Sequence, residues 1–434
     1  MVTSRPAPPP STADPAADED EPATSVAPSS SRPWTERELA DDENAPASAA
    51  ALGSWRRAVT VGVAAYTVSR MCVLAGAGVR ASSLAVEANV EGRPQPGTPA
   101  RLAFDTFTLW DARWYLEIVR GGYPRSIPAG ITFNQLEARA AFFPLYPLLI
   151  RAMDRILPGG DVLAAVAINV VLGLIATLLV GLLARQLFDD SVAERAMVLF
   201  AVFPGSYVLS FAYSEALLIV LAALCLWMLL EERWLLAGVT AALATATRPN
   251  GVALIAACAV AAFLAIRARR DWRSLIAPAL APVGFVVFHV WLAVHTGERM
   301  PWFRVQREAW REGTSFGATA VKNTLEFVTQ PLSSPTNALT FASLVALVGG
   351  LWALRRFRLP WPMMVYIAVV IGLMLLPATV TARPRFLFTA FPLIISSAAW
   401  WPRRDRAGWD LLLVACGAGL TGLTALYAQF GAVP

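Results

Sequence analysis

Long runs of apolar residues constrain this chain more than any other feature. Windows of about 20 mostly apolar residues, the length a helix needs to cross a bilayer, recur from residue 58 onward. Because 56% of the residues are hydrophobic and 15% are charged, too little polar surface is present for a water-soluble globule. We therefore predict an all-α integral membrane protein, a polytopic bundle of about eleven transmembrane helices. The predicted spans are 58–79, 162–184, 196–212, 214–230, 234–249, 251–267, 274–295, 336–354, 360–379, 385–401 and 408–429.

The first part of the chain has a different composition. Residues 1–54 are rich in Pro, Ala, Ser and acidic residues, with almost nothing to bury, which predicts a disordered tail. No apolar segment follows a basic start in the first thirty residues, so we expect the first span, rather than a signal peptide, to direct insertion. The membrane domain is predicted to cover 55–434.

Basic residues in short loops predict the orientation, because such loops stay on the cytoplasmic side. Placing the N-terminus in the cytoplasm of a plasma-membrane protein puts every arginine-dense short loop inside. The outer side then receives two long loops, 80–160 and 296–335. The arginines of the short inner loops account for the net charge of +5. We therefore expect no nucleic-acid partner. The inner loops contain Arg267, Arg269, Arg270 and Arg273, then Arg355, Arg356 and Arg358, then Arg403, Arg404 and Arg406.

Two apolar or aromatic stretches of the outer loops are predicted to lie at the membrane interface. Segment 141–157 is apolar but contains two prolines and ends in charged residues, with a true span as the alternative. Segment 301–311 mixes basic and aromatic residues, as a helix at headgroup level does. The second segment is expected either to cover a lipid-linked substrate or to lie on the bilayer.

The first outer loop contains a carboxylate among aromatic rings. A carboxylate at Asp111 is suited to take a proton from a sugar hydroxyl, while neighbouring rings stack on the sugar. Asp105 offers a second carboxylate in the same loop. Two alternatives are that Asp111 caps the helix beginning near Ala112 and that the rings belong to an interfacial aromatic belt. The predicted substrate-binding neighbours of Asp111 are Trp110, Arg113, Trp114 and Tyr115.

Several arginines are predicted on the same outer side. Arg248 and Asn250 belong to a Thr-Arg-Pro-Asn-Gly turn in which a guanidinium and free backbone N–H groups can hold a phosphate. The alternative for Arg248 is an arginine that extends its charged end to the membrane surface. Arg383 and Arg385 form a comparable pair at another helix junction.

Two further charged residues lie within or beside predicted spans. Arg70 is costly in lipid, so we expect it to face the protein interior and to pair with a carboxylate or a ligand phosphate. Glu215 is predicted at the outer ends of two adjacent helices. Its role there is either to orient a basic residue or to bind sugar hydroxyls, and the alternative is a hydrated acidic residue in a turn. His289 and His295 are too isolated for a metal site, and the predicted membrane domain 55–434 contains no Asp-x-Asp motif for a nucleotide-sugar donor.

An ordered set of motifs resembles a known family. Trp110-Asp111-x-x-Trp114-Tyr115 is followed by Gly122-Tyr123, by the Phe-Phe-Pro-Leu-Tyr-Pro stretch 142–147, by Tyr213-Ser214-Glu215 and by the Arg-Pro-Asn-Gly turn 248–251. The order resembles the PIG-V-like mannosyltransferases, relatives of the enzyme that adds the second mannose to glycosylphosphatidylinositol anchors, with homologues in actinobacteria. Eukaryotic members tend to have a histidine where this chain has Trp114. The resemblance runs over roughly 60–400.

The resemblance implies a GT-C-type glycosyltransferase. Its donor would be a polyprenyl-phosphate mannose, its acceptor a lipid-linked or cell-envelope glycan, and its partners otherwise membrane lipids. Asp111 would be the base of a single inverting displacement. From charge and membrane side, we expect Arg248, with Arg383 or Arg385 and Arg70, to hold the leaving phosphate. Because a lipid phosphate leaves readily, neither a cofactor nor a metal is expected.

Besides a non-catalytic scaffold that keeps the fold without the activity, two alternatives remain open. One is a GT-C enzyme for another polyprenyl-phosphate sugar, such as arabinose or glucose. The other is a lipid or sugar transporter, in which ionisable groups and broken helices gather near the middle of the membrane. In this chain the predicted ionisable groups cluster at the outer helix ends and in one long loop, which favours a catalyst at the interface.

Overall fold

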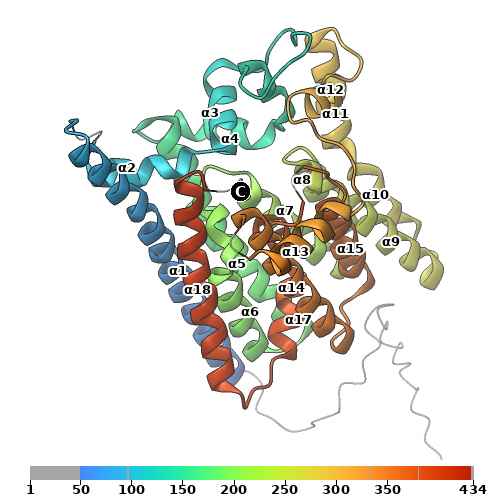
Figure 1. The fold of residues 1–434 in the computed structure, drawn as a ribbon. Helices are drawn as coiled ribbons and strands as arrows, with labels where there is room; N and C mark the ends of the chain where they lie inside the picture. Colours follow the sequence, from blue (N-terminus) through green and yellow to red (C-terminus); the bar gives the residue numbers. More distant parts are fainter. Residues whose placement is uncertain (1–48, 95–96, 332, 380, 432–434) are drawn as a thin grey trace, which may run out of the picture. The chain divides into compact units, whose positions relative to one another are not determined.

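The computed structural model describes residues 49–94, 97–331, 333–379 and 381–431, and these residues form helices and connecting loops (Figure 1). The predicted tail lies outside the described residues up to position 48, and α1 begins at Ala49. The α-helices are α1 Ala49–Val90, α2 Pro99–Asp105, α3 Asp111–Gly121, α4 Leu145–Asp154, α5 Gly160–Leu187, α6 Asp190–Val202, α7 Glu215–Leu230, α8 Trp234–Thr245, α9 Val252–Arg269, α10 Ile276–Leu280, α11 Val283–Thr296, α12 Pro301–Glu308, α13 Ala318–Thr329, α14 Pro335–Arg356, α15 Trp361–Leu375, α16 Pro384–Thr389, α17 Pro392–Trp400 and α18 Arg406–Ala428. Short 3₁₀ helices are η1 Thr106–Thr108, η2 Leu136–Ala141, η3 Pro204–Leu209, η4 Pro249–Gly251 and η5 Trp272–Leu275.

The described part of the chain confirms the predicted all-helical membrane fold. Six helical segments are long and apolar enough to cross a membrane: Gly53–Val90, Gly160–Leu187, Pro249–Arg269, Trp272–Thr296, Pro335–Arg356 and Arg406–Ala428. Three shorter apolar helices, Glu215–Leu230, Trp234–Thr245 and Trp361–Leu375, accompany them. Many of their apolar side chains are exposed, as expected where lipid is the solvent.

Several predicted spans are shorter or broken, and proline is the main physical cause. The window 196–212 divides at Pro204 into α6 and η3, and the window 385–401 divides before Pro392 into α16 and α17. Proline lacks the N–H that the helix ladder needs and its ring collides with the preceding turn. The first helix is longer than predicted, because α1 continues to Val90 whereas the predicted span ends at position 79.

The short helices of the two long loops gather at one end of the long helices. Figure 1 shows α3, α4 and α12 there, and α12 packs on η2 and on α11. Helix α4 has 10 residues, too few to cross a bilayer, so the alternative of a true span at 141–157 is wrong.

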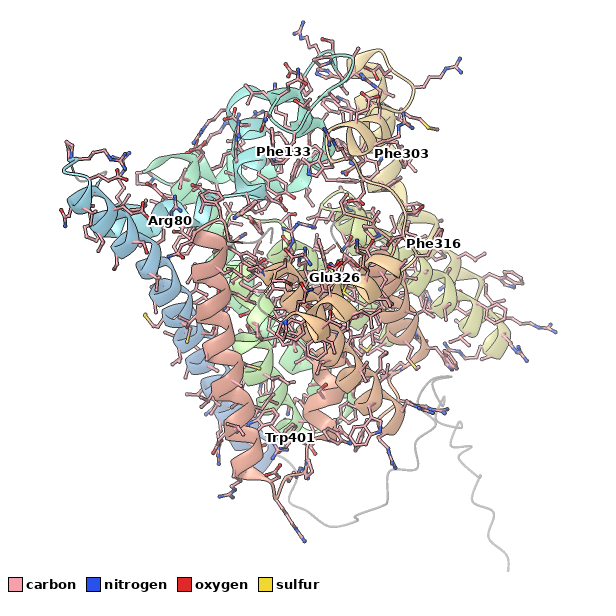
Figure 2. The ribbon with its side chains drawn as sticks, viewed as in Figure 1. Arg80, Phe133, Phe303, Phe316, Glu326 and Trp401 are labelled. Atoms are coloured by element: carbon pink, nitrogen blue, oxygen red, sulfur yellow. The ribbon has the colours of Figure 1, made fainter. Side chains whose placement is uncertain are left out.

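The arginine-dense loops lie at the other end of the same helices. Helix α18 runs from Arg406 to Ala428, and its last turn contacts Trp110 of the first long loop. Trp401, next to the 403–406 arginines, lies far from Phe133 and Phe303 of the two long loops (Figure 2). Helix α14 likewise ends in Arg355 and Arg356. The arginine-dense loops at 355–358 and 403–406 thus lie at the end opposite the two long loops, and the side of the membrane that each end faces stays a prediction.

Candidate active site

Asp111 is the first residue of α3, and its carboxylate contacts an arginine rather than the helix backbone. Trp110 is the N-cap residue of the helix and its side chain makes no capping hydrogen bond, so Asp111 follows the cap position. Instead, Oδ2 of Asp111 accepts a hydrogen bond from Nη1 of Arg385 at 2.7 Å. The helix-cap alternative for Asp111 is therefore wrong, and the carboxylate takes part in an ion pair beside a cavity.

Trp110 holds the backbone before Asp111 in an uncommon conformation. Its φ is 59° and its ψ is −122°, a region that costs a non-glycine residue about 1–3 kcal/mol. The indole Nε1 donates to the main-chain oxygen of Tyr427 at 2.9 Å, and the ring lies 5.2 Å from that of Phe430. The last turn of α18 thus fixes the residue that orients Asp111.

Arg385 reaches Asp111 because α16 packs closely on η3. A Cβ atom at Gly205 would collide with the carbonyl oxygen of Pro384, so glycine is required for this approach. The guanidinium of Arg385 is 7% exposed and lies over the rings of Phe386 and Tyr213. Its Nη1 is also 3.8 Å from Oε1 of Glu215. Arg385 therefore contacts two carboxylates from different segments.

Glu215 and Arg248 form the second ion pair of the site. Glu215 begins α7 and is fully buried, with its Oε2 at 2.8 Å from Nη1 of Arg248. A negative charge is favoured at a helix N-terminus by the exposed backbone N–H groups. Arg248 also donates to Oγ of Ser214 at 3.3 Å, and that hydroxyl lies 2.6 Å from the hydroxyl of Tyr115. Asp111, Arg385, Glu215 and Arg248 therefore form one continuous network.

Tyr115 belongs to this network as a neutral hydrogen-bonding group. Burial raises the pKa of its phenol above the ordinary value of 10, although the nearby Arg248 guanidinium partly offsets that effect. The hydroxyl therefore stays protonated and positions Ser214 instead of acting as a base.

The loop before α7 is held by side chains and backbone from other elements. Nδ2 of Asn169, on α5, donates to the main-chain oxygen of Tyr213 at 2.7 Å and to that of Phe211. The backbone N–H of Ala212 donates to the oxygen of Phe107 at 2.8 Å. These bonds connect the segment carrying Ser214 and Glu215 to the loop that leads to Asp111.

A cavity of about 820 Å³ opens beside the network. That volume suits a substrate of moderate size, since ligand pockets commonly occupy about 300–1,000 Å³. Asp111, Arg248, Asn250 and Arg385 are among its polar lining residues, and the end of α15 adds an apolar wall. The aromatic lining consists of Trp110, Trp114, Tyr115, Phe133, Phe142, Phe143, Trp302, Phe303, Trp310 and Phe386.

The second long loop forms one wall of the cavity. Nε1 of Trp302 donates to the oxygen of Ala141 at 2.9 Å, and Arg304 donates to the oxygens of Ile127 and Pro128 at 2.8 and 3.0 Å. Helix α12 is thus fastened to the first long loop. Segment 301–311 therefore lines the cavity, and whether it covers a lipid-linked substrate stays a prediction.

Glu215, predicted to bind substrate, is fully buried and does not line the cavity. Two other residues predicted to bind substrate also lie outside the cavity, with exposed side chains. Asp105 is exposed before η1, and its main-chain oxygen, not its carboxylate, accepts from Thr108. Arg113 is exposed on α3, with its guanidinium over the Trp114 ring at 5.1 Å. On α3, Asp111, Trp114 and Tyr115 share one helical face, and position 113 falls on another.

Two predicted phosphate ligands are also corrected. Arg70 faces the interior as expected, but it donates to the oxygen of Ser206 at 2.9 Å and to Oγ of Ser210 at 2.8 Å rather than to a carboxylate. Arg383 is buried and donates to Oγ1 of Thr340 at 3.0 Å. Neither residue lines the cavity. Of the pair at 383 and 385, Arg385 lies at the cavity.

Some residues of the site were not predicted. Ser214 and Asn169 support the ionic network, but a serine before a glutamate and an asparagine within an apolar span carry no distinctive pattern. Arg307 and Arg311 line the cavity from α12 and the residues after it. Their signal was the basic and aromatic mixture of segment 301–311.

Residues 141–293 match the model of the family described as dolichyl-phosphate-mannose-protein mannosyltransferase. The matched segment is less than half of the chain and includes Glu215 and Arg248, whereas Asp111 and Arg385 lie outside it. A search of curated proteins gives no match.

Solved structures of two membrane proteins resemble the chain. ArnT from Cupriavidus metallidurans, bound to undecaprenyl phosphate, has 16% identity and a TM-score of 0.47, covering 69% of this chain and 56% of that one. The archaeal oligosaccharyltransferase AglB from Archaeoglobus fulgidus, in complex with an inhibitory peptide and a dolichol-phosphate, has 14% identity and a TM-score of 0.39, covering 75% and 51%. The chain spans about half the length of these structures. The chain is thus similar, over residues 141–293, to a family of mannosyltransferases, and its described part has helices apolar and long enough to cross a membrane.

Proposed function

We propose that this protein transfers mannose from a polyprenyl-phosphate mannose to a lipid-linked or cell-envelope acceptor, with inversion, on the outer face of the plasma membrane. The observation that carries the proposal is the 2.7 Å pair of Asp111 and Arg385 at one cavity. A base for a hydroxyl and a cation for a phosphate thus lie side by side. The motif order that resembles PIG-V-like enzymes supports mannose as the sugar.

The proposed reaction is one displacement. The acceptor hydroxyl oxygen bonds to the anomeric carbon, and the bond from that carbon to the lipid-phosphate oxygen breaks with its electron pair going to the phosphate. The hydroxyl proton passes to the Asp111 carboxylate. Arg385 and Arg248 stabilise the charge on the departing phosphate. The reaction uses the lipid-phosphate sugar itself and no cofactor, and a β-linked donor gives an α-mannoside.

Two buried donor atoms support a phosphate ligand. The Nε atoms of Arg248 and Arg385 are buried and have no hydrogen-bond partner in the described part of the chain. Buried polar atoms are rarely left unpaired, so an anion with several acceptor oxygens would complete the site. The ionised groups of the network lie at helix ends, as in Glu215 at the start of α7, whereas a transporter is expected to place such groups in the middle of its spans. Arg70, within α1, lies outside the cavity and is bonded to Ser206 and Ser210.

Transfer can be measured with purified protein in lipid nanodiscs. We expect sugar to move from a synthetic polyprenyl-phosphate mannose to acceptors in an extract of the host membranes. Matched donors with arabinose or glucose on the same lipid are expected to react at least about tenfold more slowly, the discrimination that about 1.4 kcal/mol provides. Efficient transfer of another sugar and none of mannose would contradict the donor assignment.

The orientation can be tested with cysteines at opposite ends of the bundle. Arg113 is exposed at the cavity end, and Arg404 is exposed in the arginine-rich loop. With positively charged short loops in the cytoplasm, a membrane-impermeant thiol reagent is expected to label Arg113→Cys in intact cells. It should label Arg404→Cys after permeabilisation alone. The reverse pattern would place the cavity in the cytoplasm and refute an outer-face reaction.

A further inference from the structure

A second cavity lies at the arginine-rich end of the bundle, between the last turns of α14 and α17. Its volume is about 360 Å³. Figure 1 shows the two helices side by side, and a Cβ atom at Gly350 of α14 would lie 3.4 Å from the Cβ atom of Leu393 on α17. The residues that line the cavity are Trp352, Arg356, Phe357 and Trp400.

Two tryptophan rings form a wall of this cavity. The rings of Trp352 and Trp400 lie 4.6 Å apart, inclined at 60°. Helix α17 stops at Trp400 because a residue before proline is driven out of the helical conformation, and Trp401, which precedes Pro402, has a φ of −62° and a ψ of 127°. Indole rings are enriched where a helix bundle meets the headgroups of a bilayer. The ring pair therefore indicates that the cavity lies at headgroup depth.

The polar side chains that line the cavity are all hydrogen-bond donors. The guanidinium of Arg356 and the indoles of Trp352 and Trp400 offer N–H groups and no acceptor oxygen. In the described part of the chain, none of these N–H groups has a hydrogen-bond partner, and Arg356 has no ion-pair partner. A ligand that fits must supply acceptor oxygens, and a phosphate group matches a guanidinium best.

The charge next to Arg356 is positive. Arg355 and Arg358 are exposed neighbours in the chain, and neither has an ion-pair partner among the described residues. The C-termini of α14 and α17 each add about half a negative charge. Three arginine charges outweigh these two partial charges, so an anion is attracted to the cavity.

The acidic residues at this end do not cancel that charge. Asp405 and Asp410 belong to the start of α18, which packs on α1 and α6. The other six have partners: Asp189 pairs with Arg403, Asp190 with Arg185, Glu194 with Arg57 and Glu232 with Arg269, whereas Asp271 and Glu231 accept hydrogen bonds from Trp234 and Gln186. Thirteen arginines and eight acidic residues occur in segments 185–195, 231–233, 267–273, 355–358 and 403–410.

An apolar stripe on α14 leads away from the cavity. Val345, Val348 and Trp352 follow one another at spacings of three and four residues, and Arg356 lies one turn further on the same face. The side chains of Val345 and Val348 are 55% and 65% exposed, as expected for residues that face lipid. An acyl chain lying along this stripe would bring its headgroup to Arg356.

We propose that Trp352, Arg356 and Trp400 form a binding site for the phosphate headgroup of an anionic phospholipid, taken from the leaflet at the arginine-rich end. Basic pockets between transmembrane helices bind such headgroups, and the field of the neighbouring arginines adds to the attraction. The apolar stripe favours a lipid over a free phosphate. The site lies outside the cavity of Asp111, so the inference goes beyond the proposed sugar transfer and does not depend on it.

Lipid binding can be measured by native mass spectrometry of the purified protein in a mild detergent, without donor or acceptor. We expect one phosphatidylglycerol to bind at least about tenfold more tightly than a phosphatidylcholine with the same acyl chains, because the arginines repel the choline cation. Arg356→Gln should weaken phosphatidylglycerol binding about tenfold, the usual effect of losing one charge-assisted hydrogen bond. Arg356→Lys should recover part of that loss.

Arg404→Gln is the matched control. It removes an exposed arginine from the same end of the bundle, but position 404 does not line the cavity, so the phosphatidylglycerol affinity should stay at the wild-type value. An equal loss in the Arg356 and Arg404 glutamine variants would show a general attraction to the arginine-rich loops and overturn the site. Equal binding of the two lipids by the wild-type protein would also refute the proposal.

Competition distinguishes a lipid from a free phosphate. Inorganic phosphate and glycerophosphoglycerol, the headgroup without its acyl chains, should each displace bound phosphatidylglycerol only at concentrations at least about a hundredfold above that of the lipid, since they cannot occupy the apolar stripe. Displacement by either compound at the concentration of the lipid would assign the cavity to a soluble phosphate and refute a phospholipid site. Thermal unfolding without lipid should be the same for all variants, because Arg356 and Arg404 are exposed.

Discussion

Asp111→Asn is expected to lower the rate of sugar transfer by about two to four orders of magnitude, the usual contribution of a positioned general base. The amide keeps the size of the carboxylate and can still accept the hydrogen bond from Arg385, but it cannot take the proton of the attacking hydroxyl. The rate is measured with saturating polyprenyl-phosphate mannose in nanodiscs, so that weaker donor binding does not contribute.

Asp105→Asn is the matched control for this change. It makes the same substitution in the same loop, at an exposed residue outside the cavity, and we expect the wild-type rate. Thermal unfolding should show that both variants are folded. Wild-type transfer by Asp111→Asn, or an equal loss in the two variants, would refute the role of Asp111 as the base.

Glu215→Ala is expected to destabilise the protein by about 3–5 kcal/mol, because removing one partner of a buried pair leaves an uncompensated charge. Glu215 is fully buried and contacts both Arg248 at 2.8 Å and Arg385 at 3.8 Å. Its loss leaves two buried guanidiniums with one remaining carboxylate. The free energy of unfolding is measured by denaturant titration in detergent micelles.

A surface ion pair provides the control for burial. Glu194 lies 3.6 Å from Arg57, where both side chains reach solvent, so Glu194→Ala should cost less than about 1 kcal/mol. In a double-mutant cycle, Glu215→Leu with Arg248→Leu should cost less than the sum of the single changes. Equal stability of Glu215→Ala and Glu194→Ala would show that the buried network does not support the fold.

The sequence predicts the fold well where apolar runs are uninterrupted. Helices α5, α14 and α18 lie close to their predicted windows, because about 20 apolar residues leave a chain in a bilayer few other structures. The windows containing Pro204 and Pro392 were too long, since hydropathy measures composition and ignores backbone hydrogen bonding.

The site was predictable in its chemistry but not in its pairing. Asp111, Glu215, Arg248 and Arg385 were predicted separately from residue type and membrane side, and the structure joins them. The same reasoning also selected Arg70. Its partners come from the η3 region, and a buried arginine satisfied by serines and carbonyls has the same sequence signal as one that binds phosphate.

The contacts around Asp111 impose an order on biosynthesis. Asp111 pairs with a residue 274 positions later, and the Trp110 indole bonds to one 317 positions later. A chain is made from its N-terminus at about 5–20 residues per second. The first long loop therefore waits tens of seconds for α16 and α18 before its cavity can close. During that interval its aromatic surface is exposed, which makes this loop the part of the molecule most dependent on protection by chaperones or by the insertion machinery.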